Sequence, residues 1–224
     1  MPPPREPAEF RCTRHLELQA LREGHRFIAG CDEVGRGALL GPLYAAAVIL
    51  DPTESISGID DSKKLTAQQR ELLAKKIRAK ALAWHVVALT AEEVDALNVH
   101  EASRQGMLRA LKALVPAPDF ILTDAMPLHK PGEDFSIPHR AIIHGDARSV
   151  CIAAASILAK VARDEHLTKL DGVFPQYGLA RNKGYGTRVH LEALARFGPC
   201  SEHRKTYQPV KDYLLPLFPL ASPA

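Results

Sequence analysis

Runs of apolar residues separated by polar turns mark the strands of a predicted sheet. Residues 27–34 and 43–50 are two such runs, and the Gly/Pro-rich turn between them predicts an antiparallel hairpin. Shorter runs predict strands at 83–89, 120–123 and 140–143. Three strands come first and the later ones alternate with helical segments, which favours an α/β fold with a mixed sheet flanked by helices.

Helical periodicity fills most of the chain between these strands. Thr66 is placed to cap a charged amphipathic helix, with Leu72, Leu73 and Ile77 on its apolar face. Another segment is rich in small residues and predicts a central helix that approaches the sheet closely. The predicted helices are 13–23, 66–80, 92–97 with Thr90 as its cap, 100–114, the small-residue helix 149–166, and 187–197.

The length and the order of these elements predict one main domain with two short appendages. A chain of 224 residues, 46% of them hydrophobic, can bury a full core. We expect residues 1–24 to form a disordered, proline-rich lead with a short helix. Residues 25–198 would form the α/β domain, and residues 199–224 a small helical or irregular C-terminal extension.

Composition narrows the setting without naming a function. The net charge of +3 is compatible with a polyanionic partner but is common among metabolic enzymes. The four cysteines are far apart and form no Cys-x-x-Cys pair, so neither a zinc site nor a disulfide framework is indicated, and a cytoplasmic location is expected. The first residues carry no apolar segment of a secretory signal, and no membrane span is expected.

Two adjacent carboxylates, Asp32 and Glu33, lie in an apolar strand. Burying a carboxylate is costly unless it is paired, hydrogen-bonded or bound to a cation. The plain alternative is that both are edge-strand charges before a turn. Consecutive side chains of a strand point to opposite faces, so Asp32 is the expected principal ligand. Glu33 would act through its backbone carbonyl, a bridging water or a local twist.

Asp124 and Asp146 follow apolar strands, where open α/β sheets place reacting groups. Alternatively, Asp124 is a turn residue and Asp146 the N-cap of the next helix. Several carboxylates at one sheet edge repel one another unless a divalent cation is bound. Oxygen ligands without a His/Cys pattern favour Mg²⁺ or Mn²⁺. Two such ions would serve in-line displacement at phosphorus.

Several ordered motifs resemble ribonuclease HII, and together they span about Gly30 to Pro209. They are Asp32-Glu33-Val34-Gly35-Arg36-Gly37 with Gly41-Pro42, Asp61-Ser62-Lys63-Lys64-Leu65, Gly145-Asp146, the run from Ile152 to Asp164, Asn182-Lys183-Gly184-Tyr185-Gly186-Thr187, and His203-Arg204. This resemblance implies a ribonuclease-H-like catalytic domain at 25–198.

The resemblance implies that Asp32, Glu33, Asp124 and Asp146 are the four catalytic acids and metal ligands. It also implies an endonuclease that hydrolyses the RNA strand of RNA/DNA hybrids. The enzyme would nick 5′ of ribonucleotides embedded in duplex DNA, leaving 3′-hydroxyl and 5′-phosphate ends, in ribonucleotide excision during DNA replication and repair. One departure is local, because the family usually shows Val-Asp-Gly where this chain has Thr123-Asp124-Ala125. Tyr207 stands where Phe is common.

Substrate choice requires contact with the 2′-hydroxyl that distinguishes RNA from DNA. Without side chains at Gly35 and Gly37, the main chain around Arg36 can approach a sugar closely. The resemblance implies that this triplet binds the ribose at an RNA-to-DNA junction and that Tyr185 packs against the next deoxyribose. Lys63 is the expected phosphate contact. The alternatives are a plain tight turn, a half-buried surface aromatic and a solvated lysine.

RNA/DNA hybrid and ribonucleotide-containing duplex DNA are thus the expected partners of a monomeric protein. One rival is a DNA-directed nuclease of the same fold, of the resolvase or transposase type, against which the Gly35-Arg36-Gly37 triplet argues. Another is a non-catalytic hybrid-binding module, which would not need four acids because a polyanion is bound by cations. Ribonuclease HIII is disfavoured because about two dozen residues precede the first predicted strand.

Overall fold

The computed structural model describes residues 11–133 and 135–214, and across them the chain forms a five-stranded mixed sheet. The strand order is β3-β2-β1-β4-β5. β1 pairs with β2 and β2 with β3 in antiparallel fashion, whereas β4 pairs in parallel with both β1 and β5. The predicted hairpin and mixed sheet are confirmed. The strands are β1 Ile28–Val34, β2 Leu43–Leu50, β3 Ala81–Leu89, β4 Phe120–Asp124 and β5 His139–Ile142.

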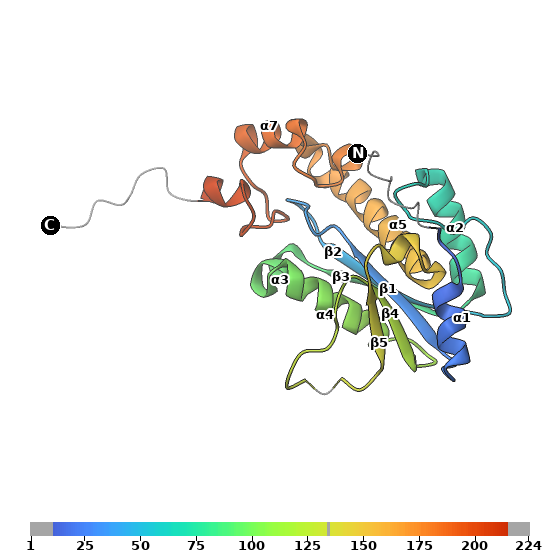
Figure 1. The fold of residues 1–224 in the computed structure, drawn as a ribbon. Coiled ribbons are helices and arrows are strands. Elements are labelled where there is room, and N and C mark those ends of the chain that lie inside the picture. Colours follow the sequence, from blue (N-terminus) through green and yellow to red (C-terminus); the bar gives the residue numbers. More distant parts are fainter. Residues whose placement is uncertain (1–10, 134, 215–224) are drawn as a thin grey trace, which may run out of the picture.

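Helices cover both faces of this sheet (Figure 1). Thr66 and Thr90 each form a capping box at the start of a helix, as their positions predicted. The prediction for Leu72 was wrong, because its side chain is 55% exposed while Leu73 and Ile77 are buried. The helices are α1 His15–Arg22, α2 Ala67–Lys80, α3 Ala91–Leu97, α4 Val99–Lys112, α5 Val150–Val173, α6 Leu179–Asn182 and α7 Arg188–Phe197, with 3₁₀ turns at Gly145–Ala147, Pro175–Tyr177 and Val210–Leu214.

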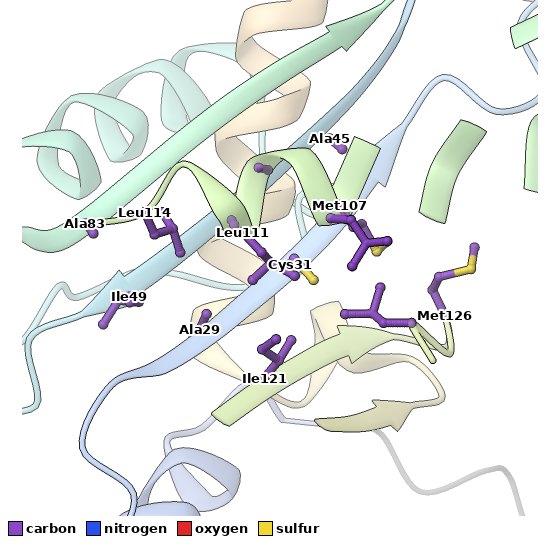
Figure 2. Close-up of a cluster of buried hydrophobic side chains, with 14 residues drawn as sticks. Ala29, Cys31, Ala45, Ile49, Ala83, Met107, Leu111, Leu114, Ile121 and Met126 are labelled. Atoms are coloured by element: carbon purple, nitrogen blue, oxygen red, sulfur yellow. The ribbon is translucent and has the colours of Figure 1, made fainter. Parts of the chain in front are cut away.

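The core has one layer on each side of the sheet. Cys31 of β1 packs with Met107 and Leu111 of α4 on one side, and Figure 2 shows this cluster. On the other side, Val48 of β2 packs with Ile157 of α5. Odd-numbered residues of β1 therefore face α4 and even-numbered ones face α5.

The small residues of α5 let this helix lie directly against β1, as the sequence predicted. Gly30 marks the contact, because a Cβ added there would lie 2.2 Å from the backbone carbon of Cys151. Ala153, Ala154 and Ala155 are fully buried in the same layer. The main chains of β1 and α5 thus touch, which fixes the helix relative to the strand that carries Asp32.

The described part of the C-terminal segment packs on the end of the sheet where β1 finishes. The Arg204 amide donates to Leu39 O at 2.9 Å, and Val210 packs with Leu39 and Leu194. The predicted disordered start and the proline-containing end lie largely in residues 1–10 and 215–224, outside the described residues. Among the described helices, none has the length and apolar character needed to cross a membrane.

Candidate active site

Three aspartates from distant parts of the sequence meet at one edge of the sheet. Asp32 lies near the end of β1, Asp124 is the last residue of β4, and Asp146 lies in the 3₁₀ turn between β5 and α5. β1 and β4 are parallel neighbours, so their carboxyl ends coincide. One carboxylate oxygen from each aspartate lies within 4.8 Å of the others. The predicted convergence of these acids is what the fold produces.

Asp32 points toward α5 and is 6% exposed. Its Oδ1 accepts the Glu33 amide at 2.7 Å. Burial raises the pKa of Asp32 well above its ordinary value, and the negative charges of Glu33 and Asp124 raise it further, while Ser156 acts in the opposite direction. Without a cation, the charged form of this carboxylate is therefore disfavoured.

Glu33 takes a different position from Asp32, as strand alternation predicted. Its Oε1 accepts from Arg36 Nη1 at 3.1 Å, while its buried Oε2 has no hydrogen-bond partner among the described residues. Burial raises the pKa of Glu33, although the nearby Arg36 opposes this shift. Glu33 lines the same groove as Asp32 and Asp124. Glu33 thus borders the three-aspartate cluster rather than joining it.

Asp124 is fixed by the turn that follows β4. Its Oδ1 accepts the Gly145 amide at 2.7 Å, and burial is the main cause of its raised pKa. Ala125 has φ +50°, in the left-handed region that favours glycine. The Thr123 hydroxyl donates to Met126 O at 2.6 Å and closes the turn. Thr123 and Ala125, the two residues that depart from the family pattern here, therefore leave the Asp124 carboxylate at the site.

Asp146 is 3% exposed and is paired with a lysine. Lys63 Nζ lies 2.9 Å from Asp146 Oδ2, although the Lys63 side chain is 78% exposed. Partial burial acts to lower the pKa of Lys63, but the hydrogen bond and charge of Asp146 outweigh it and the pKa is raised. Asp146 is not the N-cap of α5, since Ser149 fills that position. The sequence predicted that Lys63 contacts a phosphate and did not predict this ion pair.

The glycine loop, residues 35–37, lies beside the acids. Gly35 has φ +95°, and a Cβ there would lie 2.3 Å from Arg163 Nε, so glycine is required. A Cβ on Gly37 would meet no atom within 4 Å, so this position faces open space. Tyr185 is 37% exposed, and the guanidinium carbon of Arg163 lies over its ring, 5.5 Å from the ring centroid.

A groove of about 350 Å³ is lined by Asp32, Glu33 and Asp124 together with Arg36, Lys63 and Tyr185. Sequence reasoning missed four polar side chains that also line it. Ser62 and Ser156 hydrogen-bond each other at 3.0 Å, and their places inside family-like motifs were the available signal. Lys160 lies inside such a motif as well, whereas Arg70 lies outside all of them. The four are Ser62, Arg70, Ser156 and Lys160.

Two histidines, His139 and His144, lie in the segments near Asp124 and Asp146. His139 Nε2 accepts the Leu128 amide at 3.3 Å, and burial lowers its pKa. Such a histidine supports the loop after β4 rather than offering a free ligand. His144 has φ +55° in the connection that leads to Asp146.

The donor set fits hard divalent cations. Three carboxylates converge, two of them have pKa values raised by burial, and Glu33 contributes a buried oxygen without a partner. Oxygen-rich, negatively charged sites of this kind suit Mg²⁺ or Mn²⁺. Divalent metal use is therefore the chemistry that this arrangement supports.

The fold matches that of a solved nuclease. The ribonuclease H2 from Pyrococcus horikoshii OT3 superposes with a TM-score of 0.72 at 27% identity, covering 84% of this chain and 97% of that one. The fold and the acidic site together define a ribonuclease-H-like enzyme.

Sequence comparisons identify the particular family. The ribonuclease HII family model matches residues 29–210. The ribonuclease HII of Solibacter usitatus (strain Ellin6076) is 49% identical over 203 residues, which are 91% of this chain and 87% of that protein. The one from Syntrophotalea carbinolica (strain DSM 2380 / NBRC 103641 / GraBd1) is 45% identical over 209 residues, 93% of this chain and 98% of that protein. The chain belongs to the ribonuclease HII family and is an endoribonuclease H.

Proposed function

We propose that this enzyme hydrolyses the RNA strand of RNA/DNA hybrids and nicks duplex DNA 5′ of embedded ribonucleotides. The products would carry 3′-hydroxyl and 5′-phosphate ends. The observation that carries the proposal is the meeting of Asp32, Asp124 and Asp146 beside a groove that is lined by Asp32, Asp124 and Arg36 of the glycine loop. A site for phosphodiester hydrolysis and a main chain able to approach a sugar thus adjoin each other.

The acids have separate tasks in this proposal. Asp32, Asp124 and Asp146 would hold the divalent ions, and Glu33 would complete the site through its unpartnered Oε2. When bound, two such ions activate water and stabilise the leaving oxygen at phosphorus. The carboxylates are positioned before binding by the Glu33 and Gly145 amides, which limits reorganisation on binding.

Lys63 has two roles in the proposal. In the free enzyme it partly neutralises Asp146, and its exposed side chain can turn toward a phosphate of the substrate. Arg36 pairs with Glu33 in the same way, with its side chain 46% exposed. Both cations are long and solvent-accessible, so a polyanion can draw them from the acids without unfolding any element.

Ribose selection is assigned to the main chain of Gly35, Arg36 and Gly37. Gly37 faces open space, and Gly35 allows the sharp turn that brings the loop next to Asp32 and Glu33. Tyr185 borders the same groove and offers an exposed ring for the deoxyribose that follows the ribonucleotide. These contacts support an enzyme that recognises an RNA-to-DNA junction.

The proposal includes action as a monomer in the cytoplasm, on duplexes that arise in replication and repair. The four cysteines, Cys12, Cys31, Cys151 and Cys200, are free, which suits a reducing compartment.

A cleavage assay tests the proposal. Three end-labelled duplexes of one sequence are compared: all DNA, DNA with one ribonucleotide, and full hybrid, each with Mg²⁺, Mn²⁺ or chelator. The expected result is metal-dependent cutting of the two RNA-containing duplexes, with the nick 5′ of the single ribonucleotide. Asp51→Asn, which changes an acid outside the groove, serves as the control for Asp146→Asn. Cleavage of the all-DNA duplex, or product formed in chelator, would refute the proposal.

A further inference from the structure

The His203-Arg204 dipeptide has no role in the chemistry above, yet both side chains are buried. It lies between two segments that form the substrate face. One is the glycine loop with its continuation to Gly41, and the other is the segment 182–187 that carries Tyr185. The backbone joins all three, because Gly41 N donates to Glu202 O at 2.9 Å and Leu39 N donates to Gly184 O at 2.8 Å.

Arg204 holds the glycine loop. Its Nη1 donates to Arg36 O at 2.8 Å, while its Nε and Nη2 donate to Gly41 O at 3.1 and 3.0 Å. The Tyr207 hydroxyl also donates to Arg36 O at 2.8 Å. The rigid fork of a guanidinium fixes these carbonyls relative to each other in a way that a lysine cannot reproduce.

His203 holds Tyr185 through a directional chain of hydrogen bonds. The Cys200 amide donates to His203 Nδ1 at 3.0 Å, the two Nε2 atoms of His203 and His190 lie 3.2 Å apart, and His190 Nδ1 lies 3.0 Å from Tyr185 O. A backbone N–H can only donate and a carbonyl can only accept. His203 therefore donates through Nε2 to His190, and His190 donates through Nδ1 to Tyr185.

The imidazole pair is built to remain neutral. Burial, together with the neighbouring His190, lowers the pKa of His203 to about 4, and burial also lowers the pKa of His190. The Tyr177 ring covers His203 edge-on at 4.8 Å between centroids. Each ring thus keeps one donor and one acceptor at neutral pH, which is what the chain of hydrogen bonds requires.

We propose that His203-Arg204 sets the spacing between the glycine loop and Tyr185, and so acts as the positioning element for the RNA-to-DNA junction. His203 and Arg204 are adjacent and therefore separated by one rigid peptide unit. Because their side chains hold the Tyr185 carbonyl and the Arg36 carbonyl respectively, that peptide unit links the positions of the two carbonyls. In a substrate, the ribose and the following deoxyribose are likewise one backbone repeat apart. This inference rests on the proposed function, which assigns those two sugars to the two segments.

A purely structural role makes a different prediction. If the dipeptide only stabilised the fold, its loss would lower activity on every substrate in proportion to the unfolded fraction. If it sets the spacing, its loss would act on the substrate with a junction next to the ribonucleotide. A duplex with one ribonucleotide has such a junction, whereas the interior of a uniform RNA/DNA hybrid does not.

Three graded variants and a control separate these explanations. His203→Asn keeps an acceptor for Cys200 N–H but is too short to reach His190. Arg204→Lys keeps the charge but loses the fork, and Tyr207→Phe removes one of the donors to Arg36 O. The control is Arg104→Lys, which makes the same change in a buried arginine whose carboxylate partners lie on α4 and in the loop before β5.

The measured quantity is the ratio of kcat/KM on the single-ribonucleotide duplex to kcat/KM on the uniform hybrid. We expect His203→Asn and Arg204→Lys to lower this ratio about tenfold, since small misplacements of reacting groups are costly. Tyr207→Phe should lower the ratio about twofold, and Arg104→Lys should leave it unchanged. Equal losses on both substrates in the first two variants, or an unchanged ratio, would overturn the inference.

Hydrogen exchange supplies a second readout that needs no catalysis. In His203→Asn the amides of 183–187 should exchange faster, and in Arg204→Lys those of 35–38 should do so. Faster exchange confined to 200–207 would overturn the inference even if a variant were too unstable for kinetics. Failure of the proposed function appears separately, as wild-type enzyme that does not cut the RNA-containing duplexes.

Discussion

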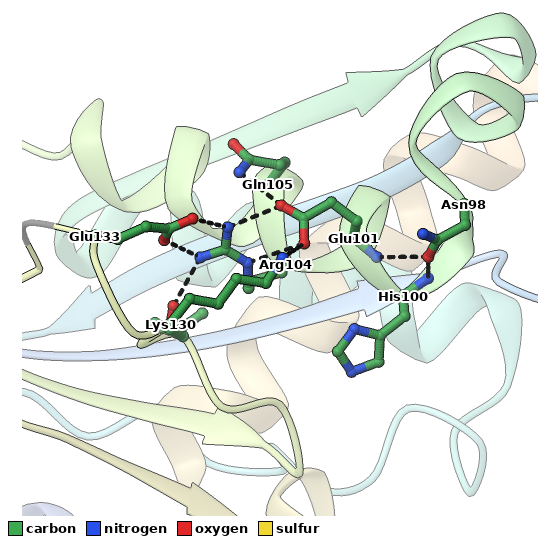
Figure 3. A network of polar contacts seen from close by, with 8 residues as sticks. Asn98, His100, Glu101, Arg104, Gln105, Lys130 and Glu133 are labelled. Atoms are coloured by element: carbon green, nitrogen blue, oxygen red, sulfur yellow. Dashed lines mark hydrogen bonds and ion pairs between the residues drawn. The ribbon is translucent and has the colours of Figure 1, made fainter.

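Two clusters of buried charge in this enzyme are built in opposite ways. Arg104, 1% exposed, is surrounded by acids in Figure 3: its Nη2 lies 2.8 Å from Glu101 Oε1 and its Nη1 lies 2.6 Å from Glu133 Oε2. Lys130 also pairs with Glu101. Here each charge meets an opposite charge supplied by the chain itself, and the pKa of Glu101 is lowered to about 2, chiefly by its hydrogen bond from Arg104.

At the active site the like charges face one another. Asp32, Asp124 and Asp146 converge, Lys63 forms an ion pair with Asp146, and the pKa values of Asp32 and Asp124 are raised. The Arg104 cluster fastens α4 to the loop after β4, while the aspartates leave a charge for a ligand to neutralise. Unfavourable burial of like charges therefore distinguishes a binding site from a structural network.

The largest effect should come from removing one acid of the like-charge cluster. Asp146→Asn should lower kcat by on the order of 10²–10³, because electrostatic stabilisation at the reacting centre is lost. The melting temperature in chelator should not fall, since one repelling charge has been removed. Cleavage assays and thermal unfolding of the same preparation measure both quantities. Near-normal turnover would contradict the role of Asp146.

Breaking the matched cluster should instead affect stability. Arg104→Met leaves Glu101 and Glu133 without their main partner, and we expect the free energy of unfolding to fall by about 2–3 kcal/mol. Part of the full penalty is relieved because Glu133 is 41% exposed. Urea denaturation measures the change. The control is Arg109→Met, whose exposed pair with Glu93 should contribute less than about 1 kcal/mol.

Divalent cations should stabilise the protein through the like-charge cluster alone. At a Mg²⁺ concentration of one hundred times Kd, the gain in unfolding free energy is about 2.7 kcal/mol. We expect this gain in wild type and in Arg104→Met, and a much smaller one in Asp146→Asn. Melting temperatures with Mg²⁺ and with chelator provide the comparison. An equal gain in all three proteins would place the bound ion elsewhere.

The two clusters should respond to pH with opposite sign in the metal-free protein. The pKa of Glu101 is lowered by its partners, so its contribution is present above its ordinary value of 4.5 and is lost as pH falls toward about 2. The pKa values of Asp32 and Glu33 are raised by burial, so the folded state binds more protons than the unfolded state. Their contribution to the free energy of unfolding is present below the ordinary carboxyl pKa values and is lost as pH rises through the raised pKa values.

One variant tests each part of this dependence of stability on pH. Glu101→Gln should flatten the acid limb by about 1–2 kcal/mol over its window, and Asp32→Asn should flatten the limb above the ordinary carboxyl range. Urea denaturation in chelator across the pH range measures both. An unchanged slope above that range in Asp32→Asn would show that the aspartate cluster does not titrate as described.

The smallest effect concerns strain beside Asp124. Ala125 has φ +50°, so Ala125→Gly should stabilise the protein by about 1 kcal/mol. Turnover should stay near the wild-type value, because the Asp124 contact to the Gly145 amide does not involve the Ala125 side chain. Denaturation and cleavage assays check this pair of expectations. A loss of stability would mean that the Ala125 methyl group contributes packing that outweighs its backbone strain.

Local patterns in the sequence predicted the five strands, the capped helices α2 and α3, and the close packing of α5 on the sheet. They did not predict α6, which is a short helix after a turn at Gly178. Leu72 was wrongly assigned to the apolar face of α2, because its position depends on how the helix is rotated against α5. Periodicity detects an apolar stripe but does not fix its edges.

The aspartates of the candidate site could be found because each carries its own signal, an acidic side chain in or after an apolar strand. The pairings of Lys63 with Asp146 and of Arg104 with Glu133 carry no such signal. Their partners are separated by 83 and 29 residues. These pairs exist only once the sheet has aligned its strand ends, so a linear reading could not anticipate them.

The contact between Gly30 and the start of α5 also bears on how the catalytic geometry tolerates sequence change. No side chain lies between the two main chains at this point. Substitutions that change the size of core residues, and thermal expansion of the side-chain packing, therefore have little effect on their separation. Asp32 comes two residues after the contact on the strand, and Asp146 comes five residues before Cys151. The relative placement of the backbones that carry Asp32 and Asp146 therefore depends in part on a contact between main chains, which substitutions of core side chains do not change.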